Sequence, residues 1–141
     1  MSDRSDVAAL VHAYASRLDS GDFDGVSALF EHATWRSEST GEVLRGREEV
    51  RAVYERVRLY DGSPRTKHLI SNLSIDVEPN VGRAAAECCF TVLQAVEPGG
   101  PIQIVLSGRY VDRFERIAEV WRFADRLFVV DLTGDLTRHF W

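Results

Sequence analysis

The sequence predicts an α+β fold, with three helices followed by a curved antiparallel sheet that closes around an apolar pocket. Apolar residues recur at helical spacing in the first part of the chain, and long strand-like stretches joined by short turns follow it. The length of 141 residues, with 45% hydrophobic and 28% charged residues, is typical of one globular domain. We therefore expect a single domain over residues 1–141. Because helices come first and strands afterwards, α+β is favoured over an alternating parallel architecture.

Three helices are expected before residue 60. From Asp6 to Leu18 the spacing of three and four predicts one buried helical face, which includes Tyr14, and Ser20 and Gly21 end the helix. Asp22 is placed to cap a shorter helix that carries Phe23, Val26, Leu29 and Phe30. The third helix spans residues 47–58, with glutamates at its start and arginines at its end, as the helix dipole favours.

Strands account for most of the remaining chain. A short strand is expected over residues 33–37 and a brief extended piece through Val43 and Leu44. Four long strands follow, over residues 66–77, 83–96, 102–114 and 120–130. The turns between the long strands are short, and two of them are rich in Gly and Pro, so neighbouring strands should pair antiparallel as a meander. Four such strands twist strongly and curl over the helices.

Charge and composition exclude several partners. The net charge of -5 and the pI near 5.3 argue against nucleic acid, because a phosphate backbone needs a concentrated Lys and Arg surface. No signal-peptide or membrane-span pattern occurs, so we expect no membrane association and a cytoplasmic location. Cys88 and Cys89 are adjacent in a predicted strand and point to opposite faces, which predicts free thiols.

The sequence offers no pattern for a metal ion or a cofactor. The histidines at positions 12, 32, 68 and 139 are scattered, and no H-x-H, H-E-x-x-H or C-x-x-C spacing is present. A Gly-rich phosphate loop and a nucleophile elbow are missing as well. We therefore expect no bound metal and no cofactor, and the chemistry left to consider is acid-base catalysis.

Four residues are candidates for that chemistry. Asp19 ends the first helix, His68 opens the first long strand, and Tyr14 and Tyr110 lie on predicted inward faces. A histidine paired with a carboxylate keeps one tautomer and gains basicity, and tyrosine hydroxyls can donate to an oxygen on which charge develops. The structural alternative stays open for each, since such residues also end helices, start strands and fill cores.

The other histidines and the tail are given lesser roles. His12 falls outside the apolar stripe of the first helix, and His32 lies in a predicted turn. His139 lies in the C-terminal tail, and we assign no function to it. Phe140 and Trp141 are expected to cover either a pocket mouth or a neighbouring subunit.

Five blocks of sequence, in order and with fitting spacing, carry a family resemblance that covers nearly the whole chain. The chain resembles SnoaL-like proteins of the nuclear transport factor 2 superfamily. The blocks are YASRLDSGDFDGVSALF at 14–30, GREEV at 46–50, RTKHLISN at 65–72, GRYVDRF at 108–114 and VWRF at 120–123.

The resemblance implies a cone-shaped α+β barrel with the pocket inside, and homodimers or homotrimers formed through the outer sheet face. Within the superfamily the chain is most similar to the branch of scytalone dehydratase, bile-acid 7α-dehydratase and hexachlorocyclohexane dehydrochlorinase. These are cofactor-free lyases built on an Asp-His pair. Asp19 and His68 stand at the matching positions, and Tyr14 resembles a phenol in the pocket of the bile-acid enzyme.

This chain also departs from that branch. Trp35 stands where scytalone dehydratase has a catalytic tyrosine, and Gln94, Gly108 and Tyr110 stand where it has other polar groups, so scytalone is not the expected substrate. The residues expected to bind a substrate are Trp35, Tyr54, Phe90, Gln94 and Phe123.

Three functions follow as hypotheses. The first is a cofactor-independent lyase, more specifically a dehydratase, or an isomerase acting on a small hydrophobic carbonyl compound of polyketide, steroid or aromatic type. The second is a non-catalytic ligand-binding or structural module, which would have a filled cavity or no contact between Asp19 and His68. The third is an epoxide hydrolase, to which Arg109 and Asp112 could contribute.

Overall fold

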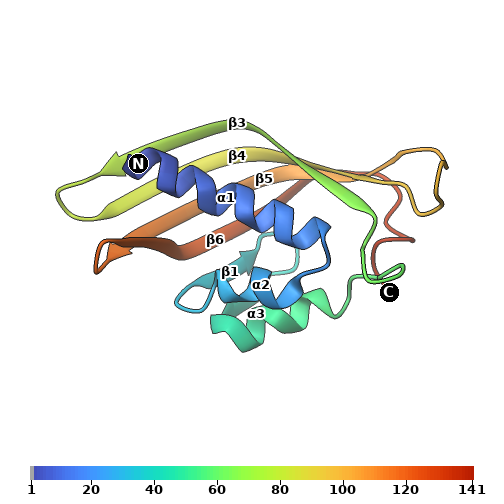
Figure 1. Cartoon of the computed structure of the whole chain (residues 1–141), viewed down its shortest axis with the longest axis horizontal. Helices are drawn as coiled ribbons and strands as arrows, with labels where there is room; N and C mark the ends of the chain where they lie inside the picture. The colour runs from blue at the N-terminus through green and yellow to red at the C-terminus, as the bar shows by residue number, and fades with distance from the viewer. Residues whose placement is uncertain (1) are drawn as a thin grey trace.

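Three helices cover one face of a curved six-stranded sheet in the computed structural model, which describes residues 2–141 (Figure 1). The predicted α+β class is confirmed. Helix α1 lies across the sheet, and α2 and α3 lie beside β1 (Figure 1). The elements are α1 Asp3–Asp19, α2 Phe23–Ala28, β1 Thr34–Ser37, β2 Val43–Arg45, α3 Gly46–Tyr54, β3 Thr66–Glu78, β4 Arg83–Gln94, β5 Gln103–Ile117 and β6 Val120–Thr133.

The strand order is β2-β1-β6-β5-β4-β3, and the four long strands form the predicted antiparallel meander. Strand β1 pairs parallel with β6, with Trp35 opposite Arg126. Strands β2 and β3 are the two edges of the sheet. The sheet is therefore curved but does not close on itself as a barrel does.

Most predicted boundaries agree with the structure to within a few residues, and two differ for a clear reason. Helix α3 ends at Tyr54, before the predicted end at residue 58. The backbone of Val57 and Arg58 pairs with the C-terminal tail instead, and Arg58 N donates to the His139 carbonyl at 2.7 Å. The turn between β5 and β6 is confined to Ala118 and Glu119, both at positive φ, so β5 continues to Ile117, past its predicted end at residue 114.

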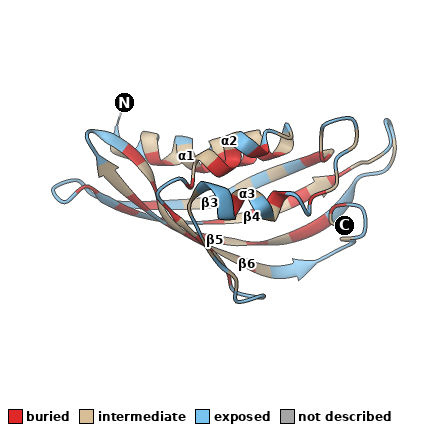
Figure 2. Cartoon of the chain, turned by 90° about the horizontal axis from the view of Figure 1, so that it is seen from below, coloured by how far each residue is buried: buried red, intermediate tan, exposed pale blue. Residues whose placement is uncertain are grey.

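The core lies between the helices and the concave face of the sheet, where the helices turn their buried sides (Figure 2). Away from the C-terminal tail it is filled by aromatic rings, with Phe123 stacked on Phe30 and packed against Phe114 at centroid distances of 4.9 and 4.7 Å. A fully buried ion pair joins Arg126 of β6 to Asp112 of β5 through two hydrogen bonds of 2.8 and 2.9 Å. This region of the core is therefore fully packed.

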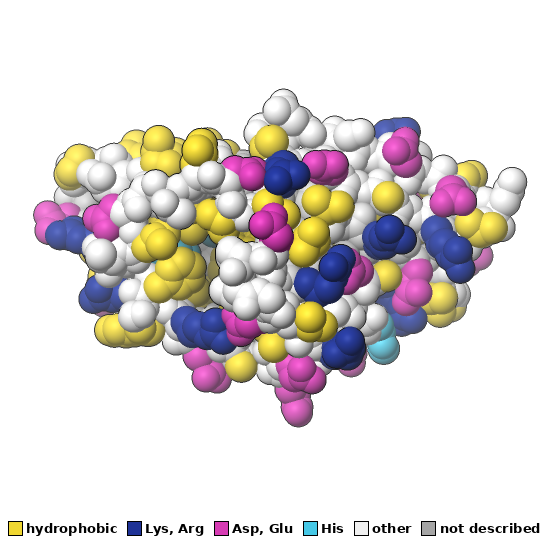
Figure 3. Space-filling model, turned by 180° about the vertical axis from the view of Figure 1, so that it is seen from behind, with side chains coloured by type: hydrophobic (Ala, Val, Ile, Leu, Met, Phe, Trp, Pro, Cys, Tyr) yellow, Lys and Arg dark blue, Asp and Glu magenta, His cyan; other side chains and the backbone are white. Residues whose placement is uncertain are grey.

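The surface carries charges of both signs. Seen from behind, basic and acidic side chains are interspersed with hydrophobic ones (Figure 3). Arg109 and Asp131, for example, form an exposed ion pair between β5 and β6 at 2.9 Å. Cys88 is buried, Cys89 is partly exposed, and both are free thiols, as predicted. Within the described residues no helix is long and apolar enough to cross a membrane.

Candidate functional site

A cavity of about 560 Å³ opens between the helices, the sheet and the C-terminal tail. This volume is within the usual range for sites that bind small molecules. The lining is mostly apolar and aromatic, with polar groups at a few places, and Glu42 and Arg56 form an ion pair at 2.8 Å. The lining includes Tyr14, Trp35, Tyr54, His68, Phe90, Tyr110, Phe128, Val130, Leu136, His139, Phe140 and Trp141.

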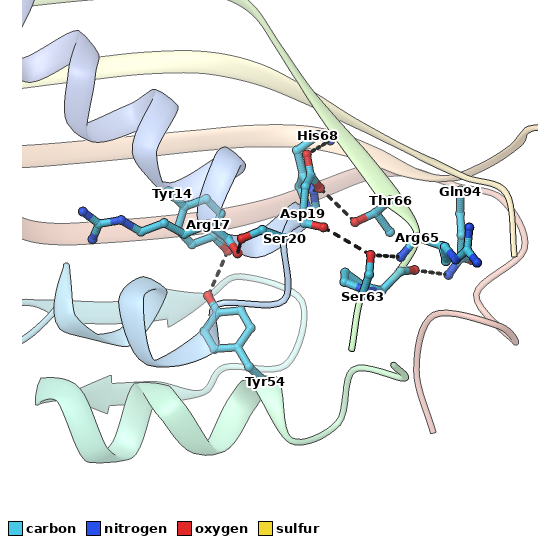
Figure 4. A network of polar contacts seen from close by, with 11 residues as sticks. Tyr14, Arg17, Asp19, Ser20, Tyr54, Ser63, Arg65, Thr66, His68 and Gln94 are labelled. Atoms are coloured by element: carbon cyan, nitrogen blue, oxygen red, sulfur yellow. Dashed lines mark hydrogen bonds and ion pairs between the residues drawn. The ribbon is translucent and has the colours of Figure 1, made fainter. Parts of the chain in front are cut away.

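Asp19 and His68 meet at the wall of this cavity, although they are far apart in the sequence. Asp19 is the last residue of α1, and His68 is the third residue of β3. The Asp19 carboxylate is 2.6 Å from His68 Nδ1, and the His68 side chain is only 4% exposed (Figure 4). Of the four residues predicted to meet, His68, Tyr14 and Tyr110 line this cavity, and Asp19 lies behind His68.

A glycine turn brings the two elements together. Gly21 follows α1 at a φ of +79°, and a side chain there would overlap the carbonyl oxygen of Gly62 in the loop before β3. This close approach places the start of β3 against the end of α1. Ser63 Oγ adds a hydrogen bond to the Asp19 carbonyl at 3.4 Å.

The carboxylate of Asp19 is held by three donors. His68 donates from its ring and from its backbone N–H, the latter at 2.8 Å, and Thr66 Oγ1 donates at 2.8 Å. Burial raises the pKa of Asp19, but these hydrogen bonds and the proximity of His68 outweigh it, so the pKa lies below its ordinary value. Asp19 is therefore an ionised acceptor at neutral pH.

The pairing fixes the role of each nitrogen of the His68 ring. Because Nδ1 faces an ionised acceptor, the proton of a neutral ring resides on Nδ1. The lone pair is then on Nε2, on the other side of a ring that lines the cavity. The geometry thus places an imidazole with a carboxylate behind it at the cavity wall.

Tyrosines supply hydrogen-bond donors on the same cavity. The hydroxyls of Tyr14 and Tyr54 are 2.9 Å apart, and Tyr110 stacks on Phe90 with ring centroids 4.3 Å apart. Burial raises the pKa of Tyr14, with Arg126 partly opposing it, and raises the pKa of Tyr54 and Tyr110 well above the ordinary value. All three phenols are therefore protonated at neutral pH.

A buried cation lies directly behind two of these phenols. The Arg126 guanidinium carbon lies 4.3 Å from the ring centroid of Tyr14 and 3.8 Å from that of Tyr110. Burial lowers the pKa of Arg126, but the Asp112 carboxylate outweighs it and raises the pKa above the ordinary value. The guanidinium stays charged and stabilises negative charge that develops near either hydroxyl.

The structure brings most of the predicted substrate-binding residues to the cavity and leaves two outside its lining. Trp35, Tyr54 and Phe90 line it. Phe123 lies in the aromatic core instead, because it is near the start of β6. Gln94 ends β4 beyond the cavity, and its amide donates to the carbonyls of Pro64 and Arg138 at 2.9 and 3.1 Å.

The two residues considered for an epoxide hydrolase, Arg109 and Asp112, do not lie together at the cavity. Arg109 and Asp112 are on opposite faces of β5, since Arg109 pairs with exposed Asp131 while Asp112 is buried with Arg126. Asp112 does not line the cavity either. Within the described residues, no group of three or more His, Cys, Asp or Glu side chains could hold a metal ion.

Sequence reasoning missed two groups of lining residues. Phe128 and Val130 face inward because a bulge in β6 between Phe123 and Asp125 shifts the alternation by one residue. His139 is 4% exposed, lines the cavity and has a buried Nδ1 without a hydrogen-bond partner. No sequence motif marks it, because only the folded tail brings it there.

Comparisons with known proteins agree with this architecture. The model of the SnoaL-like domain family matches residues 1–127. Rv3472, a protein of unknown function from Mycobacterium tuberculosis, is 26% identical, with 94% of this chain and 72% of that chain covered and a TM-score of 0.70. A scytalone dehydratase-like protein from Novosphingobium aromaticivorans is 21% identical over 94% and 87%, with a TM-score of 0.74.

ActVI-ORFA from Streptomyces coelicolor is 20% identical, with 91% of this chain and 96% of that chain covered and a TM-score of 0.77. An NTF2-like protein with a cystatin-like fold from Novosphingobium aromaticivorans is 20% identical, with 91% of this chain and 81% of that chain covered and a TM-score of 0.74. At these levels of identity, the likeness shows a shared fold, which is the nuclear transport factor 2-like fold. No curated protein matches the chain.

Proposed function

The chain belongs to the SnoaL-like domain family, and we propose that it is a cofactor-independent lyase or isomerase for a small hydrophobic carbonyl compound. The hydrogen bond between Asp19 and His68 at the wall of an apolar cavity carries this proposal. A histidine fixed by a carboxylate next to an apolar ligand site is suited to proton abstraction from carbon. The residues with a proposed catalytic role are His68, Asp19, Tyr14 and Tyr110.

In the first step, Nε2 of His68 removes a proton from the carbon α to the carbonyl group. The electron pair of the C–H bond forms an enolate, and the ring becomes an imidazolium whose Nδ1–H remains bonded to Asp19. The carboxylate, held by Thr66 at 2.8 Å, balances the new positive charge. Positioned proton transfer of this kind contributes on the order of 10²- to 10⁴-fold to a rate.

The enolate oxygen needs a donor, and the tyrosines supply it. When one hydroxyl of the Tyr14–Tyr54 pair donates to the other, the accepting hydroxyl keeps its own proton free for a ligand. Tyr110 is the second donor on this cavity, and the buried Arg126 charge beside Tyr14 and Tyr110 favours negative charge on the bound oxygen.

Two outcomes share this enolate. If the substrate carries a hydroxyl β to the carbonyl, the C–O bond breaks, the enolate electrons form a C=C bond, and the departing oxygen takes the proton from His68 as it leaves as water. Without such a leaving group, the proton returns to a different carbon and the reaction is an isomerisation. The curved apolar lining formed by aromatic rings favours a flat ring system, and we place elimination first.

Deuterium exchange tests the first step without knowledge of the natural substrate. The probe is α-tetralone, a bicyclic ketone with an exchangeable α-position, followed by NMR in deuterated buffer. The wild type is expected to accelerate exchange, and His68→Asn to lose the acceleration by about 10²-fold or more. Asparagine keeps a donor for the carboxylate but lacks the second ring nitrogen, so this variant separates basicity from folding.

The control and a second variant complete the experiment. His12→Asn removes an exposed histidine of α1 and should leave the exchange unchanged. Asp19→Asn should slow it, because the imidazolium loses its counter-charge. Equal rates for wild type, His68→Asn and Asp19→Asn would overturn the proposal and leave a non-catalytic ligand-binding module as the function.

A further inference from the structure

The C-terminal tail forms one wall of the cavity and is fixed to the body by its backbone. Leu136, His139, Phe140 and Trp141 all line the cavity. Arg58 N donates to the His139 carbonyl at 2.7 Å, and Trp141 N donates to the carbonyl of Arg56, just after α3, at 2.9 Å. The chain end lies close to the connection between α3 and β3 (Figure 1).

Side chains strengthen this attachment on both sides of His139. The carbonyl of Arg138 accepts from Tyr60 Oη at 2.6 Å and from Gln94 Nε2 at 3.1 Å. The Arg58 guanidinium donates to the Thr137 carbonyl at 3.0 Å and lies 4.8 Å from the ring centroid of Trp141. The backbone from residue 137 to residue 141 is therefore held at several positions, and this fixes the backbone from which the His139 side chain extends.

The His139 side chain is buried without a polar partner. It is 4% exposed, packs edge-on against Phe140, and its Nδ1 has no hydrogen bond within the described residues. A buried polar atom left unpaired costs about 1–3 kcal/mol. An apolar residue would avoid that cost, so the histidine is explained better by a ligand than by packing.

We propose that His139 binds an oxygen of the ligand, namely a hydroxyl β to the carbonyl group on which His68 acts. This inference rests on the proposed function and adds the substrate class, a bicyclic or larger β-hydroxy ketone. Gln94 joins the carbonyl of Pro64, just before β3, to that of Arg138, so His139 lies on the His68 side of the cavity. In this position it holds the oxygen that leaves as water, and His68 supplies the proton.

The charge state of His139 suits this role. Burial and the neighbouring His68 lower its pKa to about 4, with Asp19 opposing, so the imidazole is neutral near pH 7. A neutral imidazole has one N–H donor and one acceptor nitrogen, and a hydroxyl has both as well. The ring can therefore bind a hydroxyl without placing a second positive charge beside His68.

A matched pair of probes tests the assignment. α-Tetralone and its β-hydroxy derivative differ by a single hydroxyl, and loss of water converts the latter into α-naphthol. Calorimetric titration is done in the His68→Asn background, so that the hydroxy ketone is not consumed. With His139 intact, the hydroxy ketone is expected to bind about 3- to 10-fold more tightly than α-tetralone, the worth of one hydrogen bond.

Replacing His139 with Leu should abolish this preference while leaving the affinity for α-tetralone within about 2-fold, and Gln should retain part of it. Thermal unfolding of each variant verifies folding, and Leu is expected to fold at least as well as His because it removes an unpaired polar atom. The assignment would be overturned if His139→Leu still bound the hydroxy ketone more tightly than α-tetralone. It would also be overturned if the protein with His139 intact bound both probes equally well, or bound neither.

Binding and turnover separate the two proposals. If the hydroxyl preference depends on His139 but the wild type exchanges no α-proton, the proposed reaction fails and the binding role stands. If the wild type converts the hydroxy ketone to α-naphthol while His139→Leu has an unchanged KM, the reaction stands and the inference about His139 fails.

Discussion

The buried neutral state of His139 makes a prediction about how stability depends on pH. Its pKa of about 4 in the folded protein compares with 6.5 for an ordinary histidine. Above about pH 6.5 the ring is neutral in both states, and its contribution to stability is complete. As the pH falls from 6.5 toward 4, the His139 ring binds a proton in the unfolded chain but stays neutral in the folded protein. The free energy of unfolding therefore decreases over this pH range.

The size of the effect follows from the two pKa values. Each unit of difference corresponds to about 1.4 kcal/mol, so the full loss is about 3 kcal/mol, of which about 2.5 kcal/mol is reached at pH 4.5. The comparison is the wild type against His139→Gln, which keeps a polar side chain but cannot titrate. Other ionisable groups titrate in both proteins, so the difference between them isolates this one ring.

Urea unfolding followed by tryptophan fluorescence gives the free energy of unfolding at about pH 7.5 and about pH 4.5. Between these values the wild type should lose about 2–3 kcal/mol more than His139→Gln. His12→Gln, which removes an exposed histidine, should follow the wild type. If wild type and His139→Gln lose the same amount, the ring is not held neutral by burial, and the reasoning above is refuted.

Three further variants test other parts of the structure by urea unfolding or by exchange. Asp112→Ala leaves the buried guanidinium of Arg126 unpaired and should lower the free energy of unfolding by about 3–5 kcal/mol. Its control, Asp131→Ala, breaks an exposed ion pair and should change stability little. Equal losses in the two variants would contradict the argument from burial. Gly21→Ala should destabilise the protein by at least about 1 kcal/mol more than Gly41→Ala. Both glycines have positive φ, but only Gly21 lies against a carbonyl oxygen, that of Gly62. Equal losses would show that this close approach is unimportant for stability. Thr66→Val removes one hydrogen-bond donor to the Asp19 carboxylate and should slow α-proton exchange about 3- to 10-fold with unchanged folding. An unaltered exchange rate would exclude a role of Thr66 in holding this carboxylate for catalysis.

The fold could be predicted because its signals are local. Helical spacing marks α1, and the Asp22 cap is observed, with its side chain accepting from Gly25 N at 2.9 Å. Turns rich in Gly and Pro mark the hairpins of the meander. The parallel pairing of β1 with β6 joins residues 91 positions apart, such as Trp35 and Arg126, and no local pattern encodes it. The sequence also gives no signal for the bulge in β6, and this is why Phe128 was not expected at the cavity.

The candidate site divides in the same way. Asp19 and His68 were predicted from their places in a family pattern, and the structure supplies the contact between them. Gln94 lies on the same face of β4 as Phe90, which lines the cavity, so the face of the strand was predicted correctly. Gln94 is four residues farther along β4, however, and lies beyond the cavity. Its amide fastens the tail instead of meeting a ligand directly. Gln94 therefore contacts the tail that forms one wall of the cavity, without lining the cavity itself.

His139 shows why the remainder of the site could not be predicted. In the sequence it lies between Arg138 and Phe140 in no recognisable motif, and nothing there indicates that its ring is buried. In the fold, Arg58 and Tyr60 from the segment after α3 and Gln94 from the end of β4 hold two consecutive carbonyls of the tail. If this attachment positions the ring, Tyr60→Phe should weaken the hydroxyl preference without touching a ligand, since Tyr60 does not line the cavity. The preference would remain unchanged if burial alone placed the ring.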